Sequence, residues 1–254
     1  MALAGVTLFY MARRRFFVDR VREQHAVLSG EPADHLRRVL RARPGDLYEL
    51  SDNQSVYLAE IQGFGRGEVL FRILERLPAE QPPLRLVLQA ALVKFDRFEW
   101  IIEKATELGV EQIQPVVAAR SEKGLELGAV KRLERWRRIA REASQQARRA
   151  RLPEITLPVS FEAALAESFT WRFFLDEERS GAPLLRALPP AAERRSEDRV
   201  AILVGPEGGW TESERAAASA AGWHAVTLGS YILRAETAAT AAVALLVNAW
   251  LAEA

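Results

Sequence analysis

The sequence predicts a small β-rich domain followed by a larger α/β domain with a parallel sheet. A proline-rich run, Leu77-Pro78-Ala79-Glu80-Gln81-Pro82-Pro83, separates two regions of different periodicity, because prolines donate no hydrogen bond and restrict the preceding residue. Short alternating apolar segments precede this run, and apolar runs that alternate with segments of helical period follow it. We therefore expect domains at residues 13–77 and 84–254, joined by a linker at 78–83.

In the first domain, alternation predicts half-buried strands at residues 46–50, 56–61 and 68–74. Turn-forming residues separate these strands, at Pro44-Gly45, Asp52-Asn53 and 63–67. With one helix expected near residues 33–41, the pattern indicates a small β-barrel.

In the second domain, the run Ala201-Ile202-Leu203-Val204 suits a strand that is buried on both faces of a parallel sheet. The expected strands are 84–93, 112–118, 172–175, 200–204 and 225–228, and the expected helices are 97–108, 125–149, 211–221 and 236–251.

The composition is that of an ordinary globular protein, with 49% hydrophobic and 27% charged residues and a formal net charge of +1. Bulk charge therefore predicts no polyanionic partner. The absence of cysteine excludes disulfides, thiolate metal sites and a cysteine nucleophile. Because His25, His35 and His224 are scattered, we expect no metal site. Residues 1–11 are apolar but too short for a membrane span and lack a signal peptide's basic region, so we expect a cytoplasmic protein. Because Met11-Ala-Arg-Arg-Arg-Phe-Phe resembles a natural start, we expect residues 1–12 to be a leader, either a tag-like remnant or the result of an upstream start codon.

Two strands are each expected to end in an irregular loop that leads into a helix. The first loop is Gly205-Pro206-Glu207-Gly208-Gly209-Trp210, and Thr211 is a good N-cap for the helix that follows. The second loop runs from Leu228 to Arg234. Ligands of open α/β sheets bind at such strand ends, so the two loops predict one shared pocket. Alternatives without a ligand fit the same residues. The first loop could be only a tight turn between a strand and a helix. In the second, Arg234 and Glu236 could be a solvated pair at a helix start, and Ile232 and Leu233 could be core residues. Neither a dinucleotide-binding pattern nor a phosphate-loop lysine is present.

Four spaced motifs, covering nearly the whole chain from Arg13, resemble the ribosomal RNA small subunit methyltransferase E family. They are Lys104-Ala105-Thr106-Glu107-Leu108-Gly109-Val110, Arg151-Leu152-Pro153-Glu154-Ile155, Gly205-Pro206-Glu207-Gly208-Gly209 and the segment 228–238.

The resemblance implies a SPOUT fold, a parallel sheet with a C-terminal trefoil knot, preceded by a PUA-like RNA-binding β-barrel. It also implies a homodimer that uses S-adenosylmethionine to methylate N3 of one uridine in the decoding region of 16S ribosomal RNA, in the small ribosomal subunit. The implied cofactor-binding residues are Leu175, Gly205, Glu207, Gly208, Gly209, Leu228, Gly229, Ile232, Leu233, Ala235 and Thr237.

One motif departs from the family. Residues 144–149 stand where the family usually has Glu-Gln-(Ser/Cys)-Gly-Arg, so that Gln145 and Arg148 replace a glutamate and a glycine while Arg149 is kept. This departure leaves open how the region would position RNA or a proton.

Methylation of uridine N3 requires loss of the imide proton, and a nearby cation would stabilise the anionic base. We expect Arg234 to play this catalytic role, helped by Arg149 from a second subunit. No convincing general base emerges, because Glu207 and Glu236 are candidates by position alone.

Basic residues gather in two groups, which we expect to bind RNA. The RNA-binding candidates are Arg13, Arg14, Arg15, Arg37, Arg38 and Arg41 in the first domain and Arg138, Arg141 and Arg148 in the second. The charge pattern alone favours another interpretation of the second group, as the solvated face of an amphipathic helix.

Two other functions fit the same sequence. The chain could bind RNA without catalysis, or methylate a ribose 2′-oxygen as other SPOUT enzymes do. A nucleotide-dependent enzyme of another kind is disfavoured by the absent phosphate-loop lysine.

Overall fold

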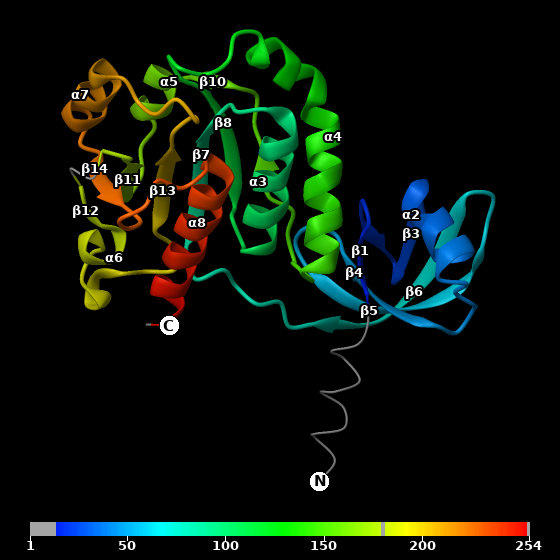
Figure 1. Cartoon of the computed structure of the whole chain (residues 1–254). Coiled ribbons are helices and arrows are strands. Elements are labelled where there is room, and N and C mark those ends of the chain that lie inside the picture. Colours follow the sequence, from blue (N-terminus) through cyan, green and yellow to red (C-terminus); the bar gives the residue numbers. More distant parts are fainter. Residues whose placement is uncertain (1–13, 179–180, 253–254) are drawn as a thin grey trace. The chain divides into compact units, whose positions relative to one another are not determined.

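The computed structural model describes residues 14–178 and 181–252. The predicted leader at 1–12 and the candidate Arg13 lie outside the described residues. The chain divides into two compact units (Figure 1). Unit 1 contains the residues up to Gln81 together with Ser144–Leu152, and unit 2 contains Pro82–Ala143 and Pro153–Ala254.

Unit 1 is built on a six-stranded sheet. Its strands are β1 (Arg15–Phe17), β2 (Val21–Arg22), β3 (His25–Ser29), β4 (Leu47–Ser51), β5 (Val56–Phe64) and β6 (Glu68–Leu77), in the order β1-β4-β5-β6-β3-β2. The β1–β4 pair is parallel and the other pairs are antiparallel. The three strands predicted from alternation correspond to β4, β5 and β6. The predicted helix is only a turn of α2 (Glu31–Asp34) followed by a π-helical turn at His35–Val39.

The segment Ser144–Leu152 packs into unit 1, so the prediction of one continuous second domain at 84–254 is wrong. The Ser51 hydroxyl donates to the Ala150 carbonyl at 2.6 Å, and the Leu152 amide donates to Asn53 Oδ1 at 2.7 Å. The helix predicted to reach residue 149 ends at Gln146, because Arg148 takes a φ of 54°, which an α-helix cannot continue through.

Unit 2 is an α/β structure, and the strand pairings of its sheet are parallel, as predicted. Its strands are β7 (Arg85–Ala91), β8 (Gln112–Val117), β9 (Glu154–Ile155), β10 (Val159–Ser160), β11 (Trp171–Leu175), β12 (Ala182–Pro183), β13 (Arg199–Val204) and β14 (His224–Thr227). The order is β10-β8-β7-β13-β11-β14-β12, and β9 pairs with β8. The five predicted strands are present; the missed ones have only two residues each.

Helices cover both faces of this sheet (Figure 1). They are α3 (Phe95–Glu107), α4 (Leu125–Gln146), α5 (Phe161–Ala166), α6 (Leu184–Ala187), a 3₁₀ turn (Ala191–Glu193), α7 (Glu212–Ala220) and α8 (Ala235–Leu251). One core joins Leu88 of β7 to Phe98 of α3 and Leu246 of α8, and a second joins Phe174 of β11 to Trp210. This explains why the central strands are apolar on both sides. None of the helices within the described residues is long and apolar enough to cross a bilayer.

Candidate functional site

Three neighbouring parallel strands of unit 2 carry the residues predicted to bind a cofactor. In the order β13, β11, β14, these strands are adjacent, and Phe174 pairs with both Leu203 and Ala225. Because carboxyl ends of parallel strands share one edge of a sheet, residues 205–211, 176–178 and 228–234 follow on the same edge. The structure therefore places the predicted residues along a single strand edge.

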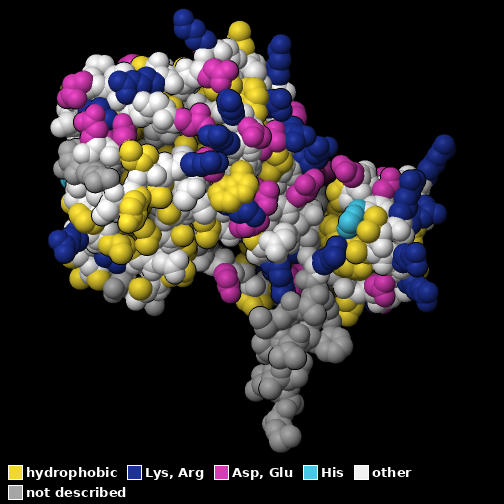
Figure 2. Space-filling view, viewed as in Figure 1, with side chains coloured by type: hydrophobic (Ala, Val, Ile, Leu, Met, Phe, Trp, Pro, Cys, Tyr) yellow, Lys and Arg dark blue, Asp and Glu magenta, His cyan; other side chains and the backbone are white. Residues whose placement is uncertain are grey.

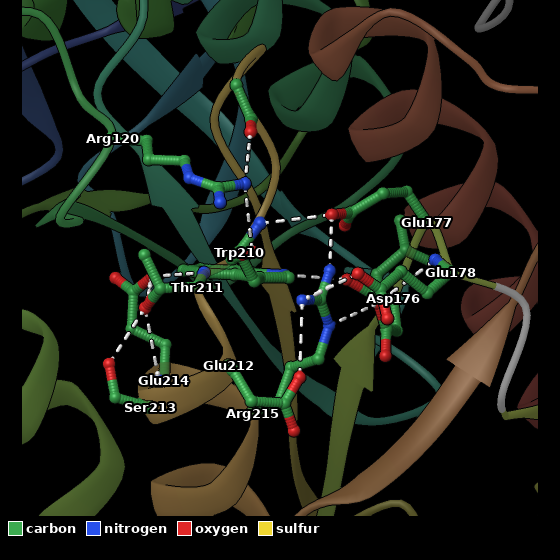
Figure 3. A network of polar contacts seen from close by, with 12 residues as sticks. Arg120, Asp176, Glu177, Glu178, Trp210, Thr211, Glu212, Ser213, Glu214 and Arg215 are labelled. Atoms are coloured by element: carbon green, nitrogen blue, oxygen red, sulfur yellow. Dashed lines mark hydrogen bonds and ion pairs between the residues drawn. The ribbon is translucent and has the colours of Figure 1, made fainter.

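A network of polar contacts joins the loops after β11 and β13 (Figure 3). The Arg215 guanidinium of α7 contacts Asp176 Oδ1 at 3.1 Å, Glu177 Oε1 at 2.6 Å and Glu178 Oε1 at 2.9 Å. Glu177 Oε1 also accepts a hydrogen bond from the Trp210 amide at 3.1 Å. The Arg215 guanidinium thus holds three consecutive carboxylates. One of them, that of Glu177, in turn holds the end of residues 205–210, here called the glycine loop.

The charge of Arg215 is stabilised within this network. Burial of the guanidinium opposes its charge, but the hydrogen bond to Asp176 and the charges of Asp176, Glu177 and Glu178 outweigh that effect, so the pKa of Arg215 lies above its ordinary value. The side chains of Arg215 and Asp176 are only 12% and 3% exposed, so solvent screens this pair weakly.

Trp210 anchors the glycine loop to the core. Its ring lies 4.8 Å from that of Phe174 and 5.3 Å from that of Phe161, measured between ring centroids. Its indole N–H donates to the Leu175 carbonyl at 2.9 Å. The loop is therefore tied to the end of β11 by both its backbone and its aromatic side chain.

Two glycines of the loop are required by contacts within the protein. Gly209 has a φ of 69°, and a Cβ there would lie 2.1 Å from Glu177 Oε1. A Cβ at Gly205 would lie 2.9 Å from the Trp210 ring. Close packing therefore explains these glycines whether or not a ligand binds. Gly208, by contrast, is exposed, and its carbonyl accepts a hydrogen bond from Arg120 at 2.9 Å.

We predict that Gly209→Ala lowers the free energy of unfolding by about 2 kcal/mol, because alanine meets both the left-handed φ and the Glu177 carboxylate. Urea denaturation followed by circular dichroism would measure this loss. Gly208→Ala is the matched control, since its new Cβ would lie no closer than 3.2 Å to Arg120. Equal stability of the two variants would contradict the prediction.

The helix after the loop begins as predicted. Thr211 caps α7, and a capping box pairs the Thr211 and Glu214 side chains with each other's backbone amides. Glu214, which is buried, also accepts a hydrogen bond from the Ala119 amide at 2.8 Å. The loop after β8 is thereby fixed to the start of α7.

The loop after β14 exposes apolar side chains. Tyr231 is 86% exposed, Ile232 79% and Leu233 38%, so the alternative that Ile232 and Leu233 form plain core is excluded. Exposed apolar side chains in one loop are typical of a ligand or protein contact. No described residue pairs with the Arg234 guanidinium, which is also exposed.

Glu236 and Glu207 are held differently. Glu236 Oε2 is buried and has no hydrogen-bond partner among the described residues. Glu207 is exposed and forms an ion pair with Arg97 of α3. Of the other predicted cofactor-binding residues, Ala235 is buried and Thr237 is exposed at the start of α8.

The comparisons with known proteins decide the family. A family model described as RNA methyltransferase domain matches residues 80–247. Ribosomal RNA small subunit methyltransferase E of Mycobacterium tuberculosis is 34% identical over 94% of both chains, and that of Synechocystis is 34% identical over 93% of this chain and 77% of the relative. The chain belongs to the ribosomal RNA small subunit methyltransferase E family.

Two solved structures resemble the whole chain. Ribosomal RNA small subunit methyltransferase E of Neisseria gonorrhoeae, bound to S-adenosylmethionine, has a TM-score of 0.80 and 30% identity and covers 93% of this chain and 97% of that one. A putative methyltransferase of Legionella pneumophila, also in complex with S-adenosylmethionine, has a TM-score of 0.82 and 27% identity over 93% and 98%. Both of these similar proteins therefore bind S-adenosylmethionine.

In this member of the ribosomal RNA small subunit methyltransferase E family, the predicted basic residues differ in their availability. In unit 1, Arg14, Arg37, Arg38 and Arg41 are exposed, although Arg38 also lies 3.6 Å from Asp34, whereas Arg15 and Arg148 both form ion pairs with the buried Glu49. Arg149 belongs to unit 1, because it follows Ser144 in the segment that packs there. Figure 2 shows Lys and Arg side chains around the rim of unit 1.

Ion pairs occupy much of the basic face of α4. Arg132 and Arg135 contact Glu99 of α3, Arg137 contacts Glu134, and Arg138 lies 3.9 Å from Glu142. The hydrogen bond from Arg135 outweighs burial and lowers the pKa of Glu99. Dark blue and magenta side chains are accordingly mixed over unit 2 in Figure 2.

The sequence did not single out Arg215, Asp176, Glu177 or Arg120. The run Asp176-Glu177-Glu178 directly after a predicted strand was the available signal, since successive carboxylates at a strand end need a cation. Within the described ranges, His, Cys, Asp and Glu side chains form no group of three that could hold a metal ion.

Proposed function

We propose that the protein transfers the methyl group of S-adenosylmethionine to N3 of a uridine in 16S ribosomal RNA of the small subunit. One observation carries this proposal: the glycine loop after β13 and the loop after β14, which exposes apolar side chains, follow strands that end at the same edge of the sheet. The chain that holds them belongs to the ribosomal RNA small subunit methyltransferase E family. The relatives' name supports the ribosomal RNA substrate. The uridine and its N3 position rest on the motif resemblance.

We propose a SPOUT architecture for unit 2, with a C-terminal trefoil knot, and a PUA-like barrel for unit 1. The adjacent placement of β13, β11 and β14 supports the SPOUT architecture, since the loops at 205–210 and 228–234 follow β13 and β14. The six-stranded sheet of unit 1 supports the second.

The strand edge fits the proposed cofactor. Exposed Ile232 and Leu233 offer apolar surface to an adenine ring, and the exposed Gly208 lets a ligand approach the backbone. We assign cofactor contacts to Leu175, Gly205, Glu207, Gly208, Gly209, Leu228, Gly229, Ile232, Leu233, Ala235 and Thr237. When bound, S-adenosylmethionine supplies an electrophilic methyl group, so the protein must mainly align the reacting atoms.

Arg234 stabilises the anionic uracil in this proposal. The N3 imide of uridine is mostly protonated near neutral pH, and a guanidinium beside N3 favours the deprotonated base, more strongly once the bound substrate excludes water. Arg234 is exposed beside the apolar loop and pairs with no described residue, so its charge is available to a substrate. Arg149 of a second subunit assists it.

A homodimer is supported by α8. The helix is rich in Ala, Val and Leu, yet Ala241, Ala244 and Leu245 are only partly buried, and Leu251 is 52% exposed. Hydrophobic side chains gather over the region of α8 and α6 in Figure 2. A second copy would bury this surface.

RNA binding by the exposed arginines predicts a steep salt dependence. Arg37→Glu with Arg38→Glu is expected to reduce the slope of log affinity against log salt concentration by about 2, because each lost phosphate contact lowers it by roughly 1. Fluorescence anisotropy with transcribed 16S ribosomal RNA would measure it. Arg195→Glu, an exposed position of unit 2 outside α6 and α8, is the control. An unchanged slope in the double variant would remove these residues from the RNA-binding surface.

The proposed function is tested by incubating the protein with labelled S-adenosylmethionine and unmodified small subunits. N3 methylation blocks the pairing edge, so reverse transcription should stop beside one uridine. Label without a stop would indicate ribose 2′-O methylation. RNA binding without label would indicate a non-catalytic binding protein.

A further inference from the structure

Residues 148–152, here called the strip, lie along one face of β4 within unit 1. Side chains at alternate positions of β4 and the turn after it, Glu49, Ser51 and Asn53, contact Arg148, Ala150 and Leu152 respectively. The alternation matches the period of a strand, in which every second side chain points to the same face. The strip therefore covers this face through side-chain contacts, since β1 and β5 already occupy both edges of β4.

Glu49 is the charged member of this face. Its side chain is 2% exposed and lies between two guanidinium groups: Arg15, at 2.8 Å from Oε2, and Arg148, which pairs with Oε1. Arg15 also donates to the Arg148 carbonyl. A buried carboxylate needs such partners, so Glu49, Arg15 and Arg148 depend on one another.

The backbone at Arg148 supports a positional role. Its φ of 54° is unfavourable for a residue with a side chain, so surrounding contacts must hold it. The contacts of its guanidinium with Glu49 and of its carbonyl with Arg15 do so. The arrangement turns the chain at the end of α4 and directs the strip onto the sheet.

We propose that Arg15, Glu49 and Arg148, the Glu49 lock, hold the strip 148–152 in place so that Arg149 and the exposed Arg151 are presented to RNA. Arg15 and Arg148 are then positioning residues, and they do not contact phosphates themselves. This inference rests on the proposed RNA substrate. It assigns Arg149 and Arg151 of the strip, rather than the lock arginines Arg15 and Arg148, to the RNA-binding surface.

The variant Glu49→Gln separates the two roles by the sign of its effect. If Arg15 and Arg148 contacted phosphates, removing the carboxylate would free them and tighten RNA binding. The lock predicts the opposite. The dissociation constant for transcribed 16S ribosomal RNA should rise about five- to tenfold, because Arg149 and Arg151 are no longer held in place and must be ordered on binding. Hydrogen exchange of the Leu152 amide, which donates to Asn53, should become faster.

Glu60→Gln is the matched control, because Glu60 pairs with Arg72 at 2.6 Å on a more exposed part of the same sheet. It removes the same charge without touching the strip, and should leave Leu152 exchange unchanged and RNA binding equal or slightly tighter. Arg148→Lys should restore part of the affinity that Arg148→Ala loses. Thermal unfolding of each variant identifies any that fail to fold.

Tighter or unchanged RNA binding by folded Glu49→Gln would overturn the proposal, as would unchanged exchange at Leu152. If the unaltered protein binds no 16S ribosomal RNA while exchange at Leu152 still accelerates in Glu49→Gln, the lock stands as a structural device and the proposed substrate is wrong. Calorimetric binding of S-adenosylmethionine, a property of unit 2 residues, provides the separate measure of the proposed function.

Discussion

Arg234→Ala is expected to lower the single-turnover rate of methyl transfer by about 10²–10³-fold, the range found when one group that stabilises developing negative charge is removed. The dissociation constant of S-adenosylmethionine should change far less, because the proposed role concerns the uracil and not the cofactor. Rapid-quench measurements on unmodified small subunits, with calorimetry for the cofactor, would separate the two effects.

Arg234→Lys is the informative companion variant. It keeps a cation at the start of α8 but replaces the planar guanidinium with a flexible ammonium, so an intermediate rate is expected. A normal single-turnover rate in Arg234→Ala would remove Arg234 from the reaction. A loss confined to cofactor binding would move its role to the cofactor site.

Arg215→Ala is expected to lower the free energy of unfolding by about 3 kcal/mol, because it leaves the buried Asp176 carboxylate without this cation. This expected loss of stability lies at the low end of the range for broken buried ion pairs, since Glu177 and Glu178 are 33% and 57% exposed and solvent screens their charges. Urea unfolding would measure the change. Binding of S-adenosylmethionine should also weaken, because Glu177 holds the Trp210 amide at the end of the glycine loop.

Two further variants test the cause of the stability loss expected in Arg215→Ala. Glu212→Gln should have almost no effect, since Glu212 is 88% exposed and lies 4.0 Å from Arg215. Arg215→Met combined with Asp176→Asn should recover part of the stability by removing the uncompensated charge. If Arg215→Ala were no less stable than Glu212→Gln, the network would contribute nothing to the fold.

Much of unit 2 follows from local patterns. The run at 200–204 predicted a doubly covered strand, and Ile202 and Leu203 are each buried in a different core. Thr211 predicted a helix start and is the N-cap of α7. These features depend on residues close together in the chain, which is why periodicity and capping rules could find them.

The contacts that position the loops depend on distant residues. Arg215 and Asp176 are 39 positions apart, and Arg15 and Arg148 are 133 apart, so no local pattern connects them. Arg215 resembled an ordinary solvated residue of α7, and Arg148 one of a continuous helix. The left-handed turn at Arg148 arises from partners in unit 1 that sequence spacing does not reveal.

The inserted strip also limits how this chain can be divided. The backbone passes between the two units at 81–82, at 143–144 and again at 152–153. A fragment that stops at Gln81 would lack the cover over Glu49 and Ser51 and would expose a buried carboxylate and hydroxyl to water. The N-terminal portion is therefore not a freely exchangeable module, and gene fusions or truncations that transplant it must carry a short piece from the middle of the chain.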